Sequence, residues 1–316
     1  MFNILILLPT GLALLYLGAE GLVRGSSSLA LKFRISPLII GLTVVAYGTS
    51  SPELVISLKT ALSGHGAIAV GNVIGSNIFN IAVILGLSSI LYPLRIQVKL
   101  LRLDAPIMIA VSLVLLIVFR DFYISRSEGF ILLIGAISYT AGNLILAQNE
   151  RPGKEVEREF TEALEKKTLS FRIDGLLIGA GLLSLVIGSQ FFVNGAIELA
   201  RIAGLSEAII GITIVAAGTS LPELATSVVA ALKKEPDIAI GNIIGSNIFN
   251  ILAILGCSSL VSPLNGIGIN MTDLYVMAGF SILLFPMLWS GFILKRSEGI
   301  ILLILYIVFI YYRLPK

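Results

Sequence analysis

Cysteine, histidine and charged residues are all scarce in this chain. Its single cysteine, Cys257, excludes an intrachain disulfide, and its place in an apolar run favours a packing role. With one histidine, His65, and one cysteine, the sequence holds no Cys/His metal cluster, and we find no serine–histidine–aspartate constellation in it. Only 13% of the residues are charged, whereas about a quarter are charged in soluble domains. The composition therefore excludes an ordinary soluble domain and argues against a hydrolase.

Apolar residues, by contrast, are abundant and occur in long runs. They make up 56% of the 316 residues, and the mean hydropathy is +0.98. A membrane-spanning helix needs about 20 mainly apolar residues. Ten apolar segments of about this length follow one another, at 3–33, 36–63, 67–91, 103–120, 124–147, 171–202, 206–232, 237–262, 271–290 and 296–313. We predict an all-α polytopic membrane protein with ten transmembrane helices. The compact loops and the lack of a targeting segment predict a prokaryotic plasma membrane.

The two halves of the sequence repeat each other. When position 71 is laid on position 241, the run GNVIGSNIFN at 71–80 matches GNIIGSNIFN at 241–250, and this repeat alignment holds without a gap. We therefore divide the chain into a first five-helix repeat, 1–147, a polar linker, 148–170, and a second five-helix repeat, 171–316. The repeat predicts two structurally equivalent halves.

The number of spans in each repeat sets their relative orientation. Five is odd, so the second repeat enters the membrane from the opposite side and is inverted. If the N-terminus is outside, the cytoplasmic connections hold 15 Lys and Arg residues and the outer side holds 5. The positive-inside rule then predicts both termini outside and a cytoplasmic linker. Inverted repeats with interrupted helices indicate a secondary transporter.

Each repeat has a proline and a glutamate in the middle of an apolar segment, in GTSSPE at 48–53 and GTSLPE at 218–223. A proline inside a helix removes one N–H and clashes with the carbonyl four residues back, so the turn opens. In hydrocarbon, the freed carbonyls are tolerated only where they face protein or a wet cavity. A carboxylate at the bilayer centre costs at least ~2.5 kcal/mol. Such a concentration of oxygen atoms indicates a site for a hard cation such as Ca2+.

The inverted repeats should bring the two breaks face to face. Glu53 and Glu223 would then share one site, and their mutual repulsion would let the pair hold either one divalent cation or protons. The following segments add a polar helical face in each repeat, because residues four apart lie on one side of a helix. These faces consist of Asn72, Ser76, Asn80 and of Asn242, Ser246, Asn250.

The paired motifs, each followed by GN-x-IGSNIFN, resemble the two alpha repeats of the cation/Ca2+ exchanger superfamily. The alpha repeats fall here at 46–86 and 216–256, and the resemblance covers the whole ten-span chain. The sequence is similar to prokaryotic Na+/Ca2+ and H+/Ca2+ exchangers. The resemblance implies four broken or kinked core helices around a site in the middle of the membrane. It also implies that two long helices, 3–33 and 171–202, slide to alternate the access to that site.

The resemblance also implies a set of ligands. Glu53 and Glu223 would bind Ca2+ directly, together with the backbone carbonyls of Thr49 and Thr219. Flanking cation ligands are implied at the carbonyls of Ala46 and Ala216 and at the side chains of Ser50, Ser220, Ser76, Ser246 and Asn80. Asn250 belongs to the predicted site but departs from the family, because Na+/Ca2+ exchangers of this type often have an aspartate there.

That departure bears on the counter-ion. With Asn80 and Asn250 both neutral, two carboxylates limit the charge of the site to −2. One Ca2+ or two protons neutralise this charge, whereas several Na+ ions would exceed it. We therefore predict H+/Ca2+ antiport. The alternative is Na+/Ca2+ antiport at the same site, because the GTS-x-PE motif is typical of Na+ exchangers.

Three functions from other classes stay open at this point. A Ca2+ channel could also use paired carboxylates, although channels usually gain their ligand rings by oligomerisation. An intramembrane hydrolase would need a nucleophile and a base, and a structural scaffold would not need twin Pro–Glu breaks. We expect Ca2+, a counter-cation and the lipid bilayer as partners, with no cofactor, no nucleic acid and no enzymatic activity.

Overall fold

The computed structural model describes residues 2–149, 169–203 and 216–313. The regular elements of the described chain are helices and four two-residue strands, and the elements labelled η are wider, π-helical stretches. The first repeat contains α1 (Phe2–Phe33), α2 (Pro37–Ile40), η1 (Gly41–Val45), α3 (Ala46–Thr49), α4 (Ser51–Leu62), α5 (Gly66–Phe79), η2 (Asn80–Leu85), α6 (Gly86–Leu91), β1 (Leu94–Arg95), η3 (Leu100–Asp104), α7 (Ala105–Val118), β2 (Tyr123–Ile124) and α8 (Arg126–Asn149). The second repeat contains α10 (Phe171–Ile202), α12 (Ala216–Gly218), α13 (Leu221–Leu232), α14 (Pro236–Phe249), η5 (Asn250–Ile254), α15 (Leu255–Val261), β3 (Leu264–Asn265), α16 (Met271–Trp289), β4 (Ile293–Leu294) and α17 (Arg296–Arg313).

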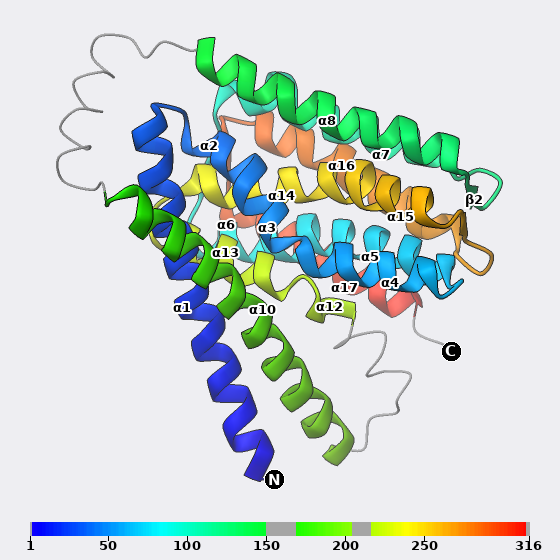
Figure 1. Ribbon diagram of the computed structural model, residues 1–316, viewed down its shortest axis with the longest axis horizontal. Coiled ribbons are helices and arrows are strands. Elements are labelled where there is room, and N and C mark those ends of the chain that lie inside the picture. The colour runs from blue at the N-terminus through cyan, green and yellow to red at the C-terminus, as the bar shows by residue number, and fades with distance from the viewer. Residues whose placement is uncertain (1, 150–168, 204–215, 314–316) are drawn as a thin grey trace.

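These helices form a multi-span bundle (Figure 1). By length and composition, seven described helices can cross a membrane, or eight if the bent pair Pro37–Thr49 and Ser51–Leu62 counts as one span. Together with α13 and α17 they follow one another in the order of the ten predicted segments. The start of the seventh segment, 206–215, and most of the predicted linker lie outside the described residues. The all-helical, multi-span prediction is confirmed.

Short strands between the repeats show how the repeats are related. Strand β1 pairs antiparallel with β4, and β2 pairs antiparallel with β3. In the first strand pair, Leu94 lies opposite Leu294. The repeat alignment matches these two residues with Leu264 and Ile124, which lie opposite each other in the second strand pair. Each strand pair is therefore the two-fold counterpart of the other. This relation is the one expected for inverted repeats.

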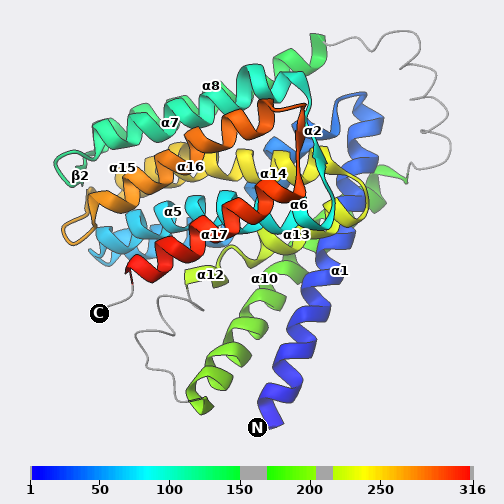
Figure 2. The same ribbon diagram turned by 180° about the vertical axis from the view of Figure 1, so that it is seen from behind.

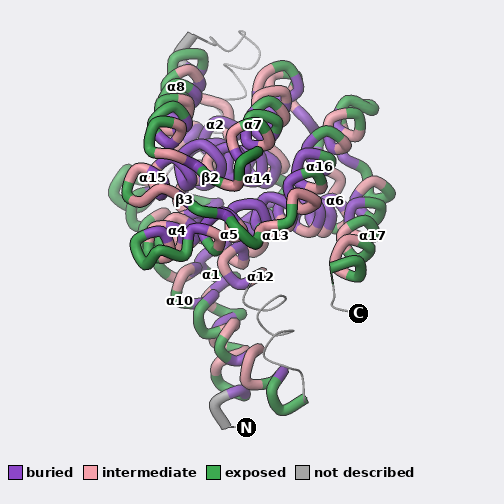
Figure 3. The backbone as a smooth tube through the Cα atoms, turned by 90° about the vertical axis from the view of Figure 1, so that its right-hand side faces the viewer, coloured by how far each residue is buried: buried purple, intermediate pink, exposed green. Residues whose placement is uncertain are grey.

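The helices divide into a central and an outer group. Residues 236–261 cover α14, η5 and α15, and 94% of the residues in their most apolar stretch are buried. In the most apolar stretch of Gly66–Leu91, 67% of the residues are buried. For Phe171–Ile202 the share is only 22%. Figure 3 shows the same gradient, with buried backbone along α14 and exposed backbone along α17 and α8. The stretches from α14 to α15 and from α5 to α6 are thus mostly enclosed by protein, while the outer helices leave one face for lipid.

The two longest helices, α1 and α10, pack side by side and run steeply across the other helices (Figures 1 and 2). Glycines line their contact. A Cβ atom on Gly181 would lie 2.8 Å from the carbonyl oxygen of Gly18, and one on Gly188 would lie 2.9 Å from the backbone nitrogen of Leu15. Small residues of this kind let helix backbones approach closely in membranes. The two helices therefore behave as one packed unit.

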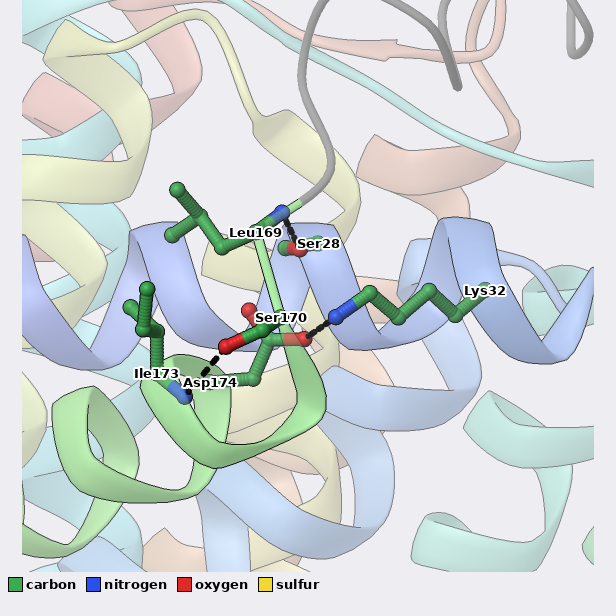
Figure 4. A network of polar contacts seen from close by, with 6 residues as sticks. All are labelled: Ser28, Lys32, Leu169, Ser170, Ile173 and Asp174. Carbon is green, nitrogen blue, oxygen red and sulfur yellow. Dashed lines mark hydrogen bonds and ion pairs between the residues drawn. The ribbon is translucent and has the colours of Figure 1, made fainter.

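A buried ion pair fastens the same two helices where the second repeat begins (Figure 4). Lys32, near the end of α1, is bonded to Asp174, a fully buried residue in the first turn of α10. The Lys32 ammonium also lies 4.5 Å from the centre of the Phe171 ring. Beside it, the hydroxyl oxygen of Ser28 accepts a hydrogen bond from the backbone N–H of Leu169 at 3.1 Å. Polar contacts thus reinforce the glycine contacts at this end.

Candidate cation-binding site

The site begins at two helix breaks. Helices α3 and α4 are bent by 45° at Ser50, whose φ of −81° and ψ of 7° leave the helical region. Ser220, between α12 and α13, has nearly the same conformation, with φ −89° and ψ 10°. Pro52 and Pro222 each occupy the second position of the helix that follows, where a missing N–H costs nothing. The predicted broken core helices are confirmed.

The two glutamates lie in the first turns of the helices that follow these breaks. Glu53 in α4 is 0% exposed and Glu223 in α13 is 1% exposed. A carboxylate is favoured there by the positive end of the helix dipole. The Ser220 hydroxyl donates to Glu53 Oε1 at 3.0 Å, and the Ser50 hydroxyl donates to Glu223 Oε1 at 2.8 Å. Each break thus bonds the glutamate of the other repeat, so the two breaks face each other.

Serines from the next helix complete one side of this cluster. The Ser76 hydroxyl lies 3.1 Å from the Ser220 hydroxyl and 3.5 Å from Glu53 Oε1. In the other repeat, the Ser246 hydroxyl donates to the carbonyl oxygen of Ala46 at 3.4 Å. The structure therefore brings both predicted serines of this layer to the two breaks.

Four asparagines bond the central helices to each other. Asn80 Nδ2 donates to Asn247 Oδ1 at 2.9 Å, and Asn250 Nδ2 donates to Asn77 Oδ1 at the same distance. Asn77 and Asn247 in turn donate to each other's backbone carbonyls, at 3.1 and 3.4 Å. Asn80 and Asn250 open the π-helical stretches η2 and η5, a type of helix distortion that is frequent at functional sites. Asn77 and Asn247 therefore position the two asparagines that were predicted as ligands.

Several buried oxygen atoms of the two glutamates and of two of these asparagines have no hydrogen-bond partner among the described residues. They are Glu53 Oε2, Glu223 Oε2, Asn80 Oδ1 and Asn250 Oδ1. Buried polar atoms normally have a partner, and carboxylate and amide oxygens are the ligands that hard cations prefer. Within the described chain, no group of three or more His, Cys, Asp or Glu side chains gathers anywhere. The site therefore offers several oxygen ligands but only two negative charges.

Asn72 and Asn242 bond the helices that carry the two glutamates. Asn72 Nδ2 donates to Ser57 Oγ at 3.1 Å and to the Glu53 carbonyl at 3.4 Å. Asn242 makes the two matching bonds in the other repeat, at 3.0 and 3.5 Å. These amides link α5 to α4 and α14 to α13 beside the two glutamates. Their role is to position the glutamates, as a second layer around the carboxylate pair.

A cavity of about 480 Å³ leads to the two breaks. It lies between α4 and α10 and reaches Gly218 and Thr219. Polar side chains of α10, including Gln190 and Asn194, line it. Thr219 thus borders this cavity, whereas the Thr49 hydroxyl donates to Asn242 Oδ1 at 3.0 Å in the packed interior. Ala216 is the first residue of α12, and its contribution stays a prediction.

A further buried carboxylate, like Asp174, was not predicted from the sequence. Asp104 is fully buried at the junction of η3 and α7, where the Tyr139 hydroxyl donates to its Oδ1 at 2.9 Å and Asn143 Nδ2 donates at 3.3 Å. The repeat alignment puts Leu274 at this position, so the repeat did not point to it. The cost of a carboxylate inside an apolar segment was a signal that could have found it.

Two buried carboxylates at facing helix breaks, in inverted repeats of membrane-spanning helices, are the arrangement typical of a secondary transporter. Comparison with known proteins gives the family. The family model described as "Sodium/calcium exchanger protein" matches residues 3–144 and 174–314. The chain therefore belongs to the sodium/calcium exchanger family and is a multi-span antiporter, not an enzyme.

Individual relatives match over nearly the whole chain. "Putative antiporter CaxA" of Alkalimonas amylolytica is 38% identical over 305 residues, which is 95% of each chain. "Sodium/calcium exchanger MaX1" of Methanosarcina acetivorans is 33% identical and covers 98% of this chain and 97% of its own. Among solved structures, the sodium-calcium exchanger NCX_Mj soaked with zero Na+ and Ca2+ superposes with a TM-score of 0.84, at 31% identity, over 98% of this chain and 99% of that one. The fold is thus that of NCX_Mj.

Proposed function

We propose that this protein exchanges Ca2+ for protons by alternating access, with Glu53 and Glu223 as the carboxylates that both ions share. The observation that supports this proposal is the set of buried oxygens without partners: one from each glutamate and one each from Asn80 and Asn250. Ca2+ takes six to eight oxygen ligands, and serine hydroxyls and carbonyls at the two breaks can supply the others. The implied ligand set from the sequence is part of this proposal.

The charge of the site favours protons as the counter-ion. Two carboxylates limit the charge to −2, because Asn250 is neutral where many Na+ exchangers of the family have an aspartate. One Ca2+ or two protons then leave a neutral site. A charged site would be costly to move past apolar surfaces. The protein would therefore change between its two states readily only when Ca2+ or two protons occupy the site. The two ions would then be exchanged for each other and neither would leak.

The packing of the long helices supports alternating access. On one side of the site, α1 packs along α13. On the other side, the cavity separates α10 from α4. Because glycine contacts and the Lys32–Asp174 pair join α1 to α10, a movement that separates α1 from α13 should carry α10 toward α4. One cavity would open while the other closes.

The basic residues suggest which side the cavity faces. The positive-inside rule predicts both termini outside, which puts the C-terminal half of α10 and the cavity on the outer side. We propose that the protein lies in a prokaryotic plasma membrane with this orientation. "Inner membrane protein YrbG" of Escherichia coli strain K12 is a relative, 40% identical over 81% of this chain and 79% of its own.

Na+ is the second candidate for the counter-ion. The names of MaX1 and NCX_Mj describe them as sodium/calcium exchangers, and the amide oxygens of Asn80 and Asn250 could serve as neutral Na+ ligands. For this alternative, protein dipoles would have to offset the excess positive charge that several Na+ ions bring to a site of charge −2.

The deciding experiment is 45Ca2+ uptake into proteoliposomes of the purified protein, driven separately by a proton gradient and by a Na+ gradient. Uptake with the proton gradient alone is the expected result. Uptake with the Na+ gradient alone would show that Na+, and not the proton, is the counter-ion. Ca2+ flux that needs neither gradient would indicate a channel and would overturn the exchange mechanism.

A further inference from the structure

The two sides of the site differ in a way that the repeat alone does not require. The repeat alignment relates the contact of α1 with α13 to the contact of α10 with α4. Val23 on α1 is 1% exposed, whereas its counterpart Val193 lines the 480 Å³ cavity. The α1 side is thus closed in this structure and the α10 side is open.

An ion pair spans the closed side. Glu20, on α1, accepts a hydrogen bond from Lys233 at the end of α13, with 2.6 Å between Nζ and Oε1. The counterparts of these residues are Gln190, which lines the open cavity, and Ser63, at the end of α4. If the two sides exchanged their conformations, Gln190 would approach Ser63. No charge pair would form, because both side chains are neutral.

We infer that the Glu20–Lys233 ion pair is a latch, specific to one state of the transport cycle, that holds the α1 side of the site closed. It joins a helix of the sliding pair to a core helix, so it must break when α1 leaves α13. The inference rests on the alternating access proposed above. In the opposite state the neutral Gln190 and Ser63 give no equivalent attraction. The latch therefore biases the protein toward the state described here.

The exposure of the pair sets the size of the effect. The two side chains are 35% and 36% exposed, so water and salt screen their attraction. Exposed ion pairs change an equilibrium by no more than about fivefold. The latch should thus tune the balance between two states of similar free energy without locking the cycle.

Cysteine accessibility measures this balance without any transport assay. Cys257 is the only native cysteine, so Cys257→Ser gives a background for single reporters at Val23→Cys and Val193→Cys. The purified protein in nanodiscs, where both sides are accessible, is labelled with a polar maleimide. With Glu20→Gln or Lys233→Gln, labelling at position 23 should become about two- to fivefold faster, and labelling at position 193 should become slower.

Three further variants separate a latch from a general disturbance. Lys234→Gln removes a neighbouring charge of the same sign outside the pair and should leave both rates unchanged. The exchanged pair Glu20→Lys with Lys233→Glu should restore them. Gln190→Glu with Ser63→Lys builds the mirror pair on the open side and should shift both rates in the direction opposite to Glu20→Gln.

Unchanged labelling rates in Glu20→Gln and Lys233→Gln would overturn the latch, even if Ca2+ exchange proceeds normally. If the native protein shows no Ca2+ exchange, the proposed function is overturned, whatever the labelling shows. The two failures are therefore distinguishable.

Discussion

The bonds of the two glutamates and of the asparagines at the centre of this molecule follow its two-fold symmetry, whereas the contacts of the long helices α1 and α10 around them, its rim, do not. At the centre, Ser50 bonds Glu223 at 2.8 Å and Ser220 bonds Glu53 at 3.0 Å. At the rim, α1 is closed on α13 while α10 leaves a cavity against α4. The same sequence repeat thus produces matched contacts in one region and unmatched contacts in the other.

The charged residues follow the same division. The glutamates of the centre occur in both repeats. By contrast, the ion pairs of the rim occur once, because Lys32 and Asp174 correspond to Ile202 and Ile4 in the other repeat. A site that serves both faces of a membrane must offer the same ligands in both states. A transporter that prefers one state needs unmatched contacts elsewhere.

The largest effect is expected at the centre. Replacing Glu53 or Glu223 by Gln removes one of the two charges that hold Ca2+ and should lower 45Ca2+ exchange by about 100-fold or more, since even indirect supports of metal ligands change affinity 10- to 100-fold. If the two-fold symmetry of the centre is functional, both variants should lose activity to a similar extent. Proteoliposome uptake measures the loss.

The control for these variants is Glu298→Gln. Glu298 lies half-buried in the first turn of α17, where it accepts a hydrogen bond from the backbone N–H of Lys295 at 2.7 Å. This variant should transport normally. A monodisperse Glu53→Gln protein that transports at the normal rate would remove that glutamate from the proposed site.

The second prediction changes the charge of the centre. Asn250→Asp adds a third carboxylate, and the maximum charge becomes −3, which several Na+ ions can balance better. The ratio of Na+-driven to proton-driven 45Ca2+ uptake should therefore rise. Asn80→Asp is the symmetry-matched variant and should raise the ratio in the same way. A rise with only one of the two would show that the centre is less symmetric in function than in its hydrogen bonds.

Repeated features are what the sequence predicted well. Proline, glutamate and hydroxyl side chains at equivalent positions predicted the two breaks. The periodic polar face of 72–80 and its counterpart at 242–250 predicted the second layer. A sequence pattern that occurs twice at fixed spacing carries both the local structure and the inverted arrangement, so the centre of the fold followed from it.

Features that occur once could not be predicted in this way. Asp174 and Lys32 are separated by 142 positions, and nothing in their local sequence pairs them. The bond between Glu20 and Lys233 depends on which side of the molecule is closed, and a sequence does not specify a state. Such contacts come from tertiary packing and can be recognised only once the helices are in place.

The third prediction tests the buried ion pair of the rim. Lys32→Met leaves the buried Asp174 carboxylate without its partner, which should cost about 3–5 kcal/mol of stability. Adding Asp174→Leu should recover most of this loss, because the other repeat has two isoleucines at these positions. Thermal unfolding in detergent measures both. Breaking the more exposed Arg313–Asp273 pair with Arg313→Met should cost less than about 1 kcal/mol.

The fourth prediction concerns the glycine contact between α1 and α10. Gly181→Ala would place a Cβ atom 2.8 Å from the carbonyl oxygen of Gly18, so the helices must move apart. Overpacking of this kind costs about 1–3 kcal/mol. Gly179→Ala on the same helix gives the same gain in helix propensity but meets no atom within 4 Å. The difference between the two melting temperatures therefore isolates the contact. If the variants unfold alike, the backbones of α1 and α10 are not held together by close approach, and the coupling of the two cavities would depend on the Lys32–Asp174 pair alone.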